Sequence, residues 1–302
     1  MKVALDIAIL FGRRTLRGLS QCAFQTNEIT GALFIAAVAV FNWRMAVFYL
    51  VSALIAALVA RALNGDKELL ELGLYQFNSA LLGLALANFF QPSSILWLYM
   101  VILAAVTAAL TVAWSKLTPL PFLAAPFILV LWAIWPFAEP LGLSKVQFGA
   151  FAHAPLLWGV AAVSTFGSAL FAPSVASGLL FLAGLLVSNW RHAVVALLGA
   201  ITAIALATQA GAPGTAINSG FVGFNGVLAA LAAYILITAD LRLVALAALL
   251  STWLASYVYR GMPVPVLASG FVLAVWLTLF LGWASPRFAG EPLNGDTDKS
   301  RY

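Results

Sequence analysis

The chain has 302 residues, of which 64% are hydrophobic and 8% are charged, and its formal net charge is +5. Soluble domains carry about 25% charged residues, so this composition excludes an ordinary soluble protein and predicts an integral membrane protein. The basic residues lie at turns and tails rather than in a run that could follow a phosphate backbone, which excludes nucleic acid as a partner.

Long uncharged stretches predict that the chain is all-α and crosses the membrane many times. Charged residues are absent from positions 72–115, 117–138, 146–190 and 193–239. A spanning helix needs about 20 apolar residues, so several of these stretches hold more than one crossing. Backbone groups in hydrocarbon must be satisfied internally, and we therefore expect the crossings to be helices.

The first half of the chain predicts five crossings and one short helix. They are expected at residues 5–26, 29–41, 44–63, 78–89 (the short helix), 94–115 and 120–137. The apolar run after Asn78 ends at Gln91-Pro92, which is too short to span the bilayer. Because Asn is a strong N-cap, we expect Asn78 to cap this helix.

Three blocks of sequence recur at one offset of 147 residues. Phe77-Asn78 returns as Phe224-Asn225, Gly31 returns as Gly178, and Asn42-Trp43-Arg44 returns as Asn189-Trp190-Arg191. Such recurrence indicates internal duplication, and the second half is expected to repeat the same elements from about residue 150. The chain is therefore divided into a first repeat (1–145), a second repeat (146–288) and a disordered cytoplasmic tail (289–302).

An odd number of crossings in each repeat would give the two copies opposite orientations, as in many transport proteins, with a pore between them. The two short helices are then re-entrant half-helices. Their N-termini expose unpaired N–H groups, and the extended residues before them expose carbonyls that could accept from an amide. An alternative, compatible with pore lining, is that Asn78 and Asn225 simply cap buried helices.

Basic residues near both ends indicate the orientation of the chain. Lys2, Arg13, Arg14 and Arg17 lie near the start, and Arg287, Lys299 and Arg301 lie near the end. By the positive-inside rule both termini are expected in the cytoplasm. A bacterial inner membrane is the expected location.

At these motifs the sequence resembles the urea transporter family, over about residues 10–285. The resemblance rests on the Phe-Asn-x-x-Leu signature that opens each short helix, and on Gln21-x-x-Phe24 followed by Thr30-Gly31. It implies a homotrimer in membrane lipid, with one pore in each protomer. Urea would pass in single file between aromatic slots and past ladders of oxygen atoms.

Carried over position by position, the resemblance implies pore residues in both repeats. The first repeat supplies Gln21 as a hydrogen-bonding group, Phe24, Phe77 and Leu81 as walls, and Asn78 at the helix start. The second supplies Phe171, Phe224 and Leu228 as walls, and Asn225. Neither a cofactor nor a metal is implied.

The sequence departs from the family pattern at three positions. Ser168 stands where a Gln or Glu is expected, so one entrance loses a long hydrogen-bonding arm, and Ala124 and Ala268 replace threonines. A dehydrated amide loses about 1–3 kcal/mol for each missing hydrogen bond. We therefore interpret the chain as a passive urea channel, with a channel for another small neutral solute (an amide analogue, ammonia or water) as the alternative.

Three other classes fit the sequence less well. An ion-coupled transporter keeps ionisable groups inside the membrane, whereas here they fall at segment ends. An ammonium channel needs a pore histidine pair, but His153 and His192 are not repeat mates. An enzyme is excluded because no metal-ligand cluster, carboxylate pair or base beside a nucleophile is present in the sequence.

Overall fold

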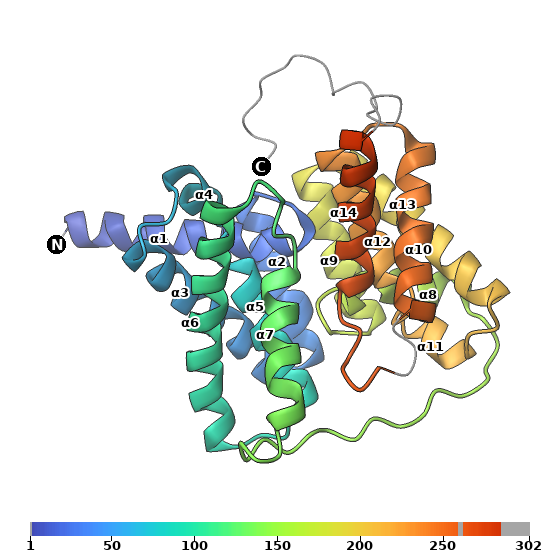
Figure 1. Ribbon diagram of the computed structural model, residues 1–302, viewed down its shortest axis with the longest axis horizontal. Coiled ribbons are helices and arrows are strands. Elements are labelled where there is room, and N and C mark those ends of the chain that lie inside the picture. The colour runs from blue at the N-terminus through green and yellow to red at the C-terminus, as the bar shows by residue number, and fades with distance from the viewer. Residues whose placement is uncertain (1, 259–261, 285–302) are drawn as a thin grey trace. The chain divides into compact units, whose positions relative to one another are not determined.

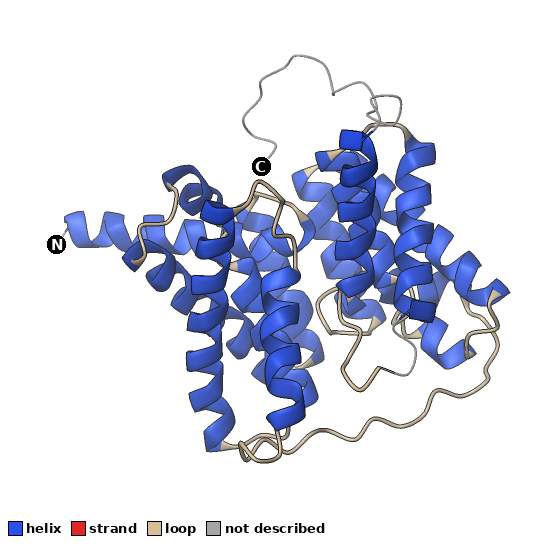
Figure 2. Ribbon diagram, viewed as in Figure 1, coloured by secondary structure: helices blue, strands red, loops and turns tan. Residues whose placement is uncertain are grey.

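The computed structural model describes residues 2–258 and 262–284, and nearly all of their regular structure is helical (Figures 1 and 2). In this part of the chain the β-structure is limited to one isolated antiparallel bridge between Phe90 and Lys145. The predicted all-α class is confirmed.

The chain separates into two compact units, Met1–Phe148 and Gly149–Tyr302. Unit 1 contains α1 (Lys2–Ser20), the 3-10 helix η1 (Gln21–Ala23), α2 (Glu28–Phe41), α3 (Trp43–Ala62), α4 (Lys67–Leu72), α5 (Phe77–Phe89), α6 (Ser94–Leu117), α7 (Ala125–Ile134) and η2 (Trp135–Phe137). Unit 2 contains α8 (Trp158–Ser168), α9 (Val175–Ser188), α10 (Trp190–Gln209), α11 (Gly214–Asn218), α12 (Phe224–Leu236), α13 (Leu241–Trp253), the π-helix η3 (Leu254–Val258) and α14 (Ser269–Ala284).

The internal repeat is visible in the bounds of the helices. α2, α3 and α5 have counterparts in α9, α10 and α12, whose first and last residues lie 147 positions later. α7 and α14 begin 144 positions apart, at Ala125 and Ser269. The second copy is therefore three residues shorter before its last helix, and positions in that region correspond at the smaller offset.

Three helices in the described residues are long and apolar enough to cross a membrane: α3, α6 and α10. A fourth candidate is the pair Ile9–Ala23 and Glu28–Phe41, which is bent by 70° at its break. The other predicted crossings correspond to shorter helices, namely α7 with η2, α8, α9, α13 with η3, and α14. The chain is a polytopic membrane protein, and the number of its crossings stays a prediction.

Two predicted crossings begin as helices later than expected. The segment predicted at 120–137 becomes helical only at Ala125, because Pro121 disfavours helical backbone before it and Pro126 is tolerated only in the first turn of a helix. The first helix of the second copy begins only at Trp158. The preceding chain bonds to α11 instead, through Ala152 and Thr215.

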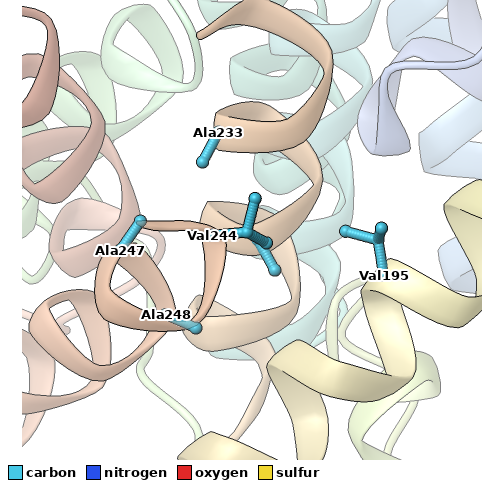
Figure 3. Packing of buried hydrophobic residues seen from close by; sticks show 6 residues of the cluster. Val195, Ala233, Val244, Ala247 and Ala248 are labelled. Carbon is cyan, nitrogen blue, oxygen red and sulfur yellow. The ribbon is translucent and has the colours of Figure 1, made fainter. Parts of the chain in front are cut away.

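Small residues let the helices approach closely. A side-chain Cβ at Gly31 would overlap the backbone of Leu16, and one at Gly178 would overlap the backbone of Val163, the matching residue of the other copy. In unit 2, Val195, Ala230, Ala233, Val244, Ala247 and Ala248 form a tightly packed cluster of small side chains from α10, α12 and α13 (Figure 3). Close packing of this kind is typical of membrane helices.

At one matched contact, the glycine and the larger residue occupy opposite positions in the two copies. A Cβ at Gly18 would lie 2.7 Å from Oε1 of Gln76, while a Cβ at Gly223, the counterpart of Gln76, would lie 2.7 Å from Oγ1 of Thr165, the counterpart of Gly18. The same contact is thus filled from opposite sides in the two units.

The hydrogen bond from the short helix to the next helix is exchanged in the same way. Ser79 of α5 donates to the Ala104 carbonyl of α6 at 2.8 Å. In unit 2 the hydroxyl is on the other helix, where Ser251 of α13 donates to the Asn225 carbonyl at 3.0 Å. One hydroxyl therefore joins the corresponding helix pair in each unit.

Replacing Gly31 or Gly178 by Ala should destabilise the protein by about 1–3 kcal/mol or more, as over-packing typically does. The new methyl group would overlap backbone atoms, which cannot move away as a flexible side chain can. The change is measured as a lower apparent Tm of the detergent-solubilised protein. Gly12→Ala and Gly159→Ala are matched controls on α1 and α8, where nothing lies within 4 Å of the added carbon. Equal melting of all four variants would contradict the close approach.

Candidate functional site

Among the described residues, the half-helices α5 and α12 are the most deeply buried α-helices of their units. Every residue of α5 from Phe77 to Ala87 is buried, as is every residue of α12 from Asn225 to Ala233. α5 packs against α3, α6 and α7, and α12 packs against α10, α13 and α14 (Figure 1). Each has 13 residues, which is shorter than the about 20 that a membrane-spanning helix needs.

The expectation that Asn78 and Asn225 are N-caps is wrong. The N-cap positions are Gln76 and Gly223, whose side chains make no capping bond, and each asparagine is the second residue of its helix. The amides instead face another segment of the same unit. The residues before the half-helices also form turns rather than extended chain, because Gly73 and Gly220 adopt positive φ and their carbonyls accept from the N–H three residues later.

Each asparagine ties its half-helix to the start of another helix. Asn78 Nδ2 donates to the Leu123 carbonyl at 2.9 Å, and its Oδ1 accepts from the Phe127 N–H at 3.3 Å. Asn225 makes the corresponding bonds in unit 2, to the Leu267 carbonyl at 3.0 Å and from the Phe271 N–H at 3.0 Å. We call this arrangement the amide bridge.

The amide bridge holds a strained turn. Leu123 and Leu267 lie in the left-handed region, with φ of 44° and 53°, which is unfavourable for a residue other than glycine. Phe24 and Phe171, a second matched pair, have φ of 59° and 57° at the break between the first two helices of each unit. Strain of this kind persists where the surrounding structure enforces it, and it concentrates at functional sites.

Gln21 of η1 and Ser168 at the end of α8 each bond to the end of the short helix that precedes the half-helix, α4 in unit 1 and α11 in unit 2. Gln21 Nε2 donates to the Leu72 carbonyl at 3.0 Å, and Ser168 Oγ donates to the Ser219 carbonyl at 2.8 Å. Leu72 and Ser219 are themselves repeat mates. The shorter serine thus makes the bond that corresponds to the one made by the glutamine amide.

An aromatic wall in unit 1 includes a residue that the sequence reasoning missed. Phe77 stacks on Phe122, with ring centroids 5.9 Å apart and planes at 27°. Leu81 follows one turn after Phe77 and is buried with it, and Ala124 is buried beside the strained Leu123. Phe122 lies two residues before Ala124, but nothing in the sequence marked its side chain.

In unit 2, a cavity of about 530 Å³ lies beside the start of the half-helix. Phe224 and Asn225 line it, together with Phe151, Phe221 and the π-helix η3. Phe221 lies between the other two rings, with centroids 5.4 Å from Phe151 and 6.3 Å from Phe224.

The remaining residues predicted for the second repeat are not part of the cavity lining. Ser168, Leu228 and Ala268 are buried, and Phe171 is half-buried at its break.

A charged side chain meets α5 near its end, where Arg44 Nη2 donates to the Ala87 carbonyl at 2.8 Å. Neither α5 nor α12 contains Asp, Glu, Lys, Arg or His. His153 lies in the irregular chain before α8, and His192, in the first turn of α10, packs edge-on against Tyr234. Within the described ranges no three His, Cys, Asp or Glu side chains gather as metal ligands.

Asn78→Ala and Asn225→Ala should each lower the apparent Tm, since each leaves a buried carbonyl and a buried N–H without their partner, at about 1–3 kcal/mol per group. Thermal unfolding in detergent measures the loss. Asn88→Ala is a control on the same helix α5, because the half-buried Asn88 takes no part in the amide bridge. If all three variants unfold at the same temperature, the amide bridge does not contribute to the stability of the protein.

Comparison with known proteins identifies the family. Residues 13–283 match the family described as Urea transporter. Urea transporter 1 of Rattus norvegicus is 25% identical over 311 aligned positions, which cover 92% of this chain and 79% of that protein. Urea transporter 1 of Ovis aries is 25% identical over 319 positions, with coverages of 95% and 81%. The chain therefore belongs to the urea transporter family, a family of membrane transporters rather than enzymes.

Proposed function

We propose that the protein conducts urea across the membrane passively, through a pore lined by the starts of the two half-helices. The observation that carries this proposal is the duplicated amide bridge, which holds a buried half-helix beginning with Phe-Asn in each unit. Family membership and the name of the relatives support urea as the solute.

The chemistry of the two half-helix starts suits a flat amide. Urea has apolar faces and polar edges, so phenylalanine and leucine side chains can sandwich it while carbonyls and amides bind its edges. Phe77 and Leu81 in unit 1, and Phe224 and Leu228 in unit 2, are the proposed walls. Phe24 and Phe171 are proposed as further walls, and Gln21 and Ser168 as polar groups of the two entrances.

The buried alanines favour a second solute class. Ala124 and Ala268 place methyl groups where the family pattern has hydroxyls, and both are buried beside the strained turns. An amide analogue with an apolar substituent forms fewer hydrogen bonds than urea, so the missing hydroxyls cost it less binding free energy. Such an analogue is the alternative solute.

The protein is proposed to be a homotrimer. In each protomer the two repeats are proposed to have opposite orientations, with tryptophan residues anchoring the chain at the membrane interface. Trp43 and Trp190 are matched, exposed residues at the first positions of α3 and α10, where an aromatic belt meets the membrane interface. Both termini are proposed to face the cytoplasm across a bacterial inner membrane. Accessibility of tags on the two termini tests this orientation, and opposite locations would refute it.

Urea flux should follow the urea gradient alone, because the half-helices carry no ionisable group that could couple it to an ion. Stopped-flow measurements on proteoliposomes should give the same urea permeability with and without an imposed proton or sodium gradient. Accumulation of urea above equilibrium under an ion gradient would rule out a passive channel.

Phe77→Ala and Phe224→Ala should each change urea permeability and reduce discrimination between urea and methylated ureas, since each removes one wall. Truncating a buried phenylalanine costs about 3–5 kcal/mol, so correct assembly is checked first by size-exclusion chromatography. Phe137→Ala and Phe280→Ala are the controls, because these rings are 60% and 64% exposed. If the wall variants and the controls conduct alike, the pore runs elsewhere.

A further inference from the structure

The backbone of the Asn-Trp-Arg motif is built alike in the two units. Asn42 Oδ1 accepts from the Arg44 N–H at 3.0 Å, and Asn189 Oδ1 accepts from the Arg191 N–H at 3.0 Å. The two asparagines have φ of −158° and −162° and ψ of 108° and 113°. The tryptophan that follows each of them is exposed. The two arginine side chains therefore start from equivalent positions.

The two side chains nevertheless end in different surroundings. Arg44 turns towards α5, where its Nη2 donates to the Ala87 carbonyl at 2.8 Å and to the Phe90 carbonyl at 3.5 Å, and its Nε is enclosed by protein. Arg191 is exposed, and its guanidinium lies over the Trp190 ring, 5.8 Å from the centroid. Long cationic side chains usually keep their charge in water, as Arg191 does. The inward path of Arg44 therefore needs a physical cause.

One cause is the residue that carries the accepting carbonyl. Ala87 has only a methyl group, which leaves room for the guanidinium, whereas its counterpart in α12 is Tyr234. The Tyr234 ring meets His192 of α10 edge-on, with centroids 6.0 Å apart. An aromatic pair thus joins α10 to α12 where the guanidinium joins α3 to α5.

A second cause is the need of the half-helix for partners at its end. The last carbonyls of a helix have no partner within the helix, and hydrocarbon offers no water to supply one. The Phe89 carbonyl accepts from the Val146 N–H at 2.8 Å, and Arg44 serves the carbonyls of Ala87 and Phe90. The ion pairs of the described residues do not include Arg44, so its charge faces these carbonyls alone. A cation at this position also offsets the negative end of the helix dipole.

α5 is therefore held at both ends. The amide bridge of Asn78 holds its first turn, and Arg44 holds its last turn. A helix fixed at one point can still tilt about that point, whereas a helix fixed at two points cannot. Phe77 is the first residue of α5 and stacks on Phe122 of another segment. Release of the last turn would let α5 tilt and would displace the Phe77 ring from this contact.

We propose that Arg44 is a positioning residue for the selection of urea: by holding the end of α5, it keeps the Phe77 wall in place. Arg191, its repeat mate, has no such role in unit 2. The effect on selection rests on the proposed channel function, whereas the hold on α5 does not.

The hold on α5 is tested apart from transport, by hydrogen–deuterium exchange of the detergent-solubilised protein. Arg44→Met removes the charge and the donors while keeping an unbranched side chain. Exchange at the end of α5 should become about tenfold faster or more, because a hydrogen bond from a charged group is lost. Arg191→Met is the matched control at the repeat position, and exchange in its half-helix α12 should not change.

The effect on selection is measured in proteoliposomes as the ratio of methylurea permeability to urea permeability. This ratio does not depend on how much protein is assembled, so a loss of stability alone leaves it unchanged. Arg44→Met should raise it about threefold, which is part of the about tenfold or greater discrimination that a pocket achieves for one methylene group. Arg191→Met should leave the ratio unchanged, and Arg44→Lys, which keeps a cationic donor, should stay closer to the unmodified protein.

Arg44→Gln is a second variant in case Arg44→Met does not assemble. Its amide is neutral and two bonds too short to replace the guanidinium, so it should have the same effects. Unchanged exchange at the end of α5 in these variants would overturn the hold. Faster exchange with an unchanged permeability ratio, or a lysine variant that behaves as the methionine variant does, would overturn the positioning role. Faster exchange in Arg44→Met but not in Arg191→Met, in a protein that conducts no urea, would uphold the hold and reject the channel function.

Discussion

The amide bridge from each half-helix is the interaction on which the rest of the structure depends. A helix that stops at membrane depth leaves backbone groups that no water can satisfy, so the protein must supply their partners itself. The asparagine side chain carries both a donor and an acceptor on a short arm. Asn78 and Asn225 use the two to bind one carbonyl and one N–H of a second segment, and so join two interrupted helices with one residue.

The position of the aromatic walls follows from this bridge. The bound carbonyl belongs to a leucine in the left-handed region, and that turn sets the direction of the residue before it. In unit 1 this residue is Phe122, which is brought onto Phe77, and in unit 2 it is Val266, which leaves a cavity. The size of one side chain beside a fixed backbone turn thus distinguishes a closed wall from an open one.

The sequence predicted local features well and tertiary contacts poorly. The half-helix expected at 78–89 begins only one residue earlier, at Phe77. It could be predicted this closely because the length of an apolar run and its Gln-Pro end are local signals. The role of Asn78 was misread, since its partners are more than 40 positions away and a capping preference describes only the adjacent chain. The cavity could not be predicted, because it arises from Val266, a π-helix and the irregular chain at Phe151 together.

The exchanged small residues bear on how a duplicated protein can evolve. Gly18 with Gln76, and Thr165 with Gly223, each fill one contact, but a combination of Thr165 with a glutamine would crowd it. A recombination event that copied α5 and its preceding turn into unit 2 would therefore bring together two large residues, whereas one that copied a whole unit would keep compatible partners. The contacting residues of each unit have therefore changed together. An exchange of sequence would disturb these contacts least if it took place between the units, near residue 148.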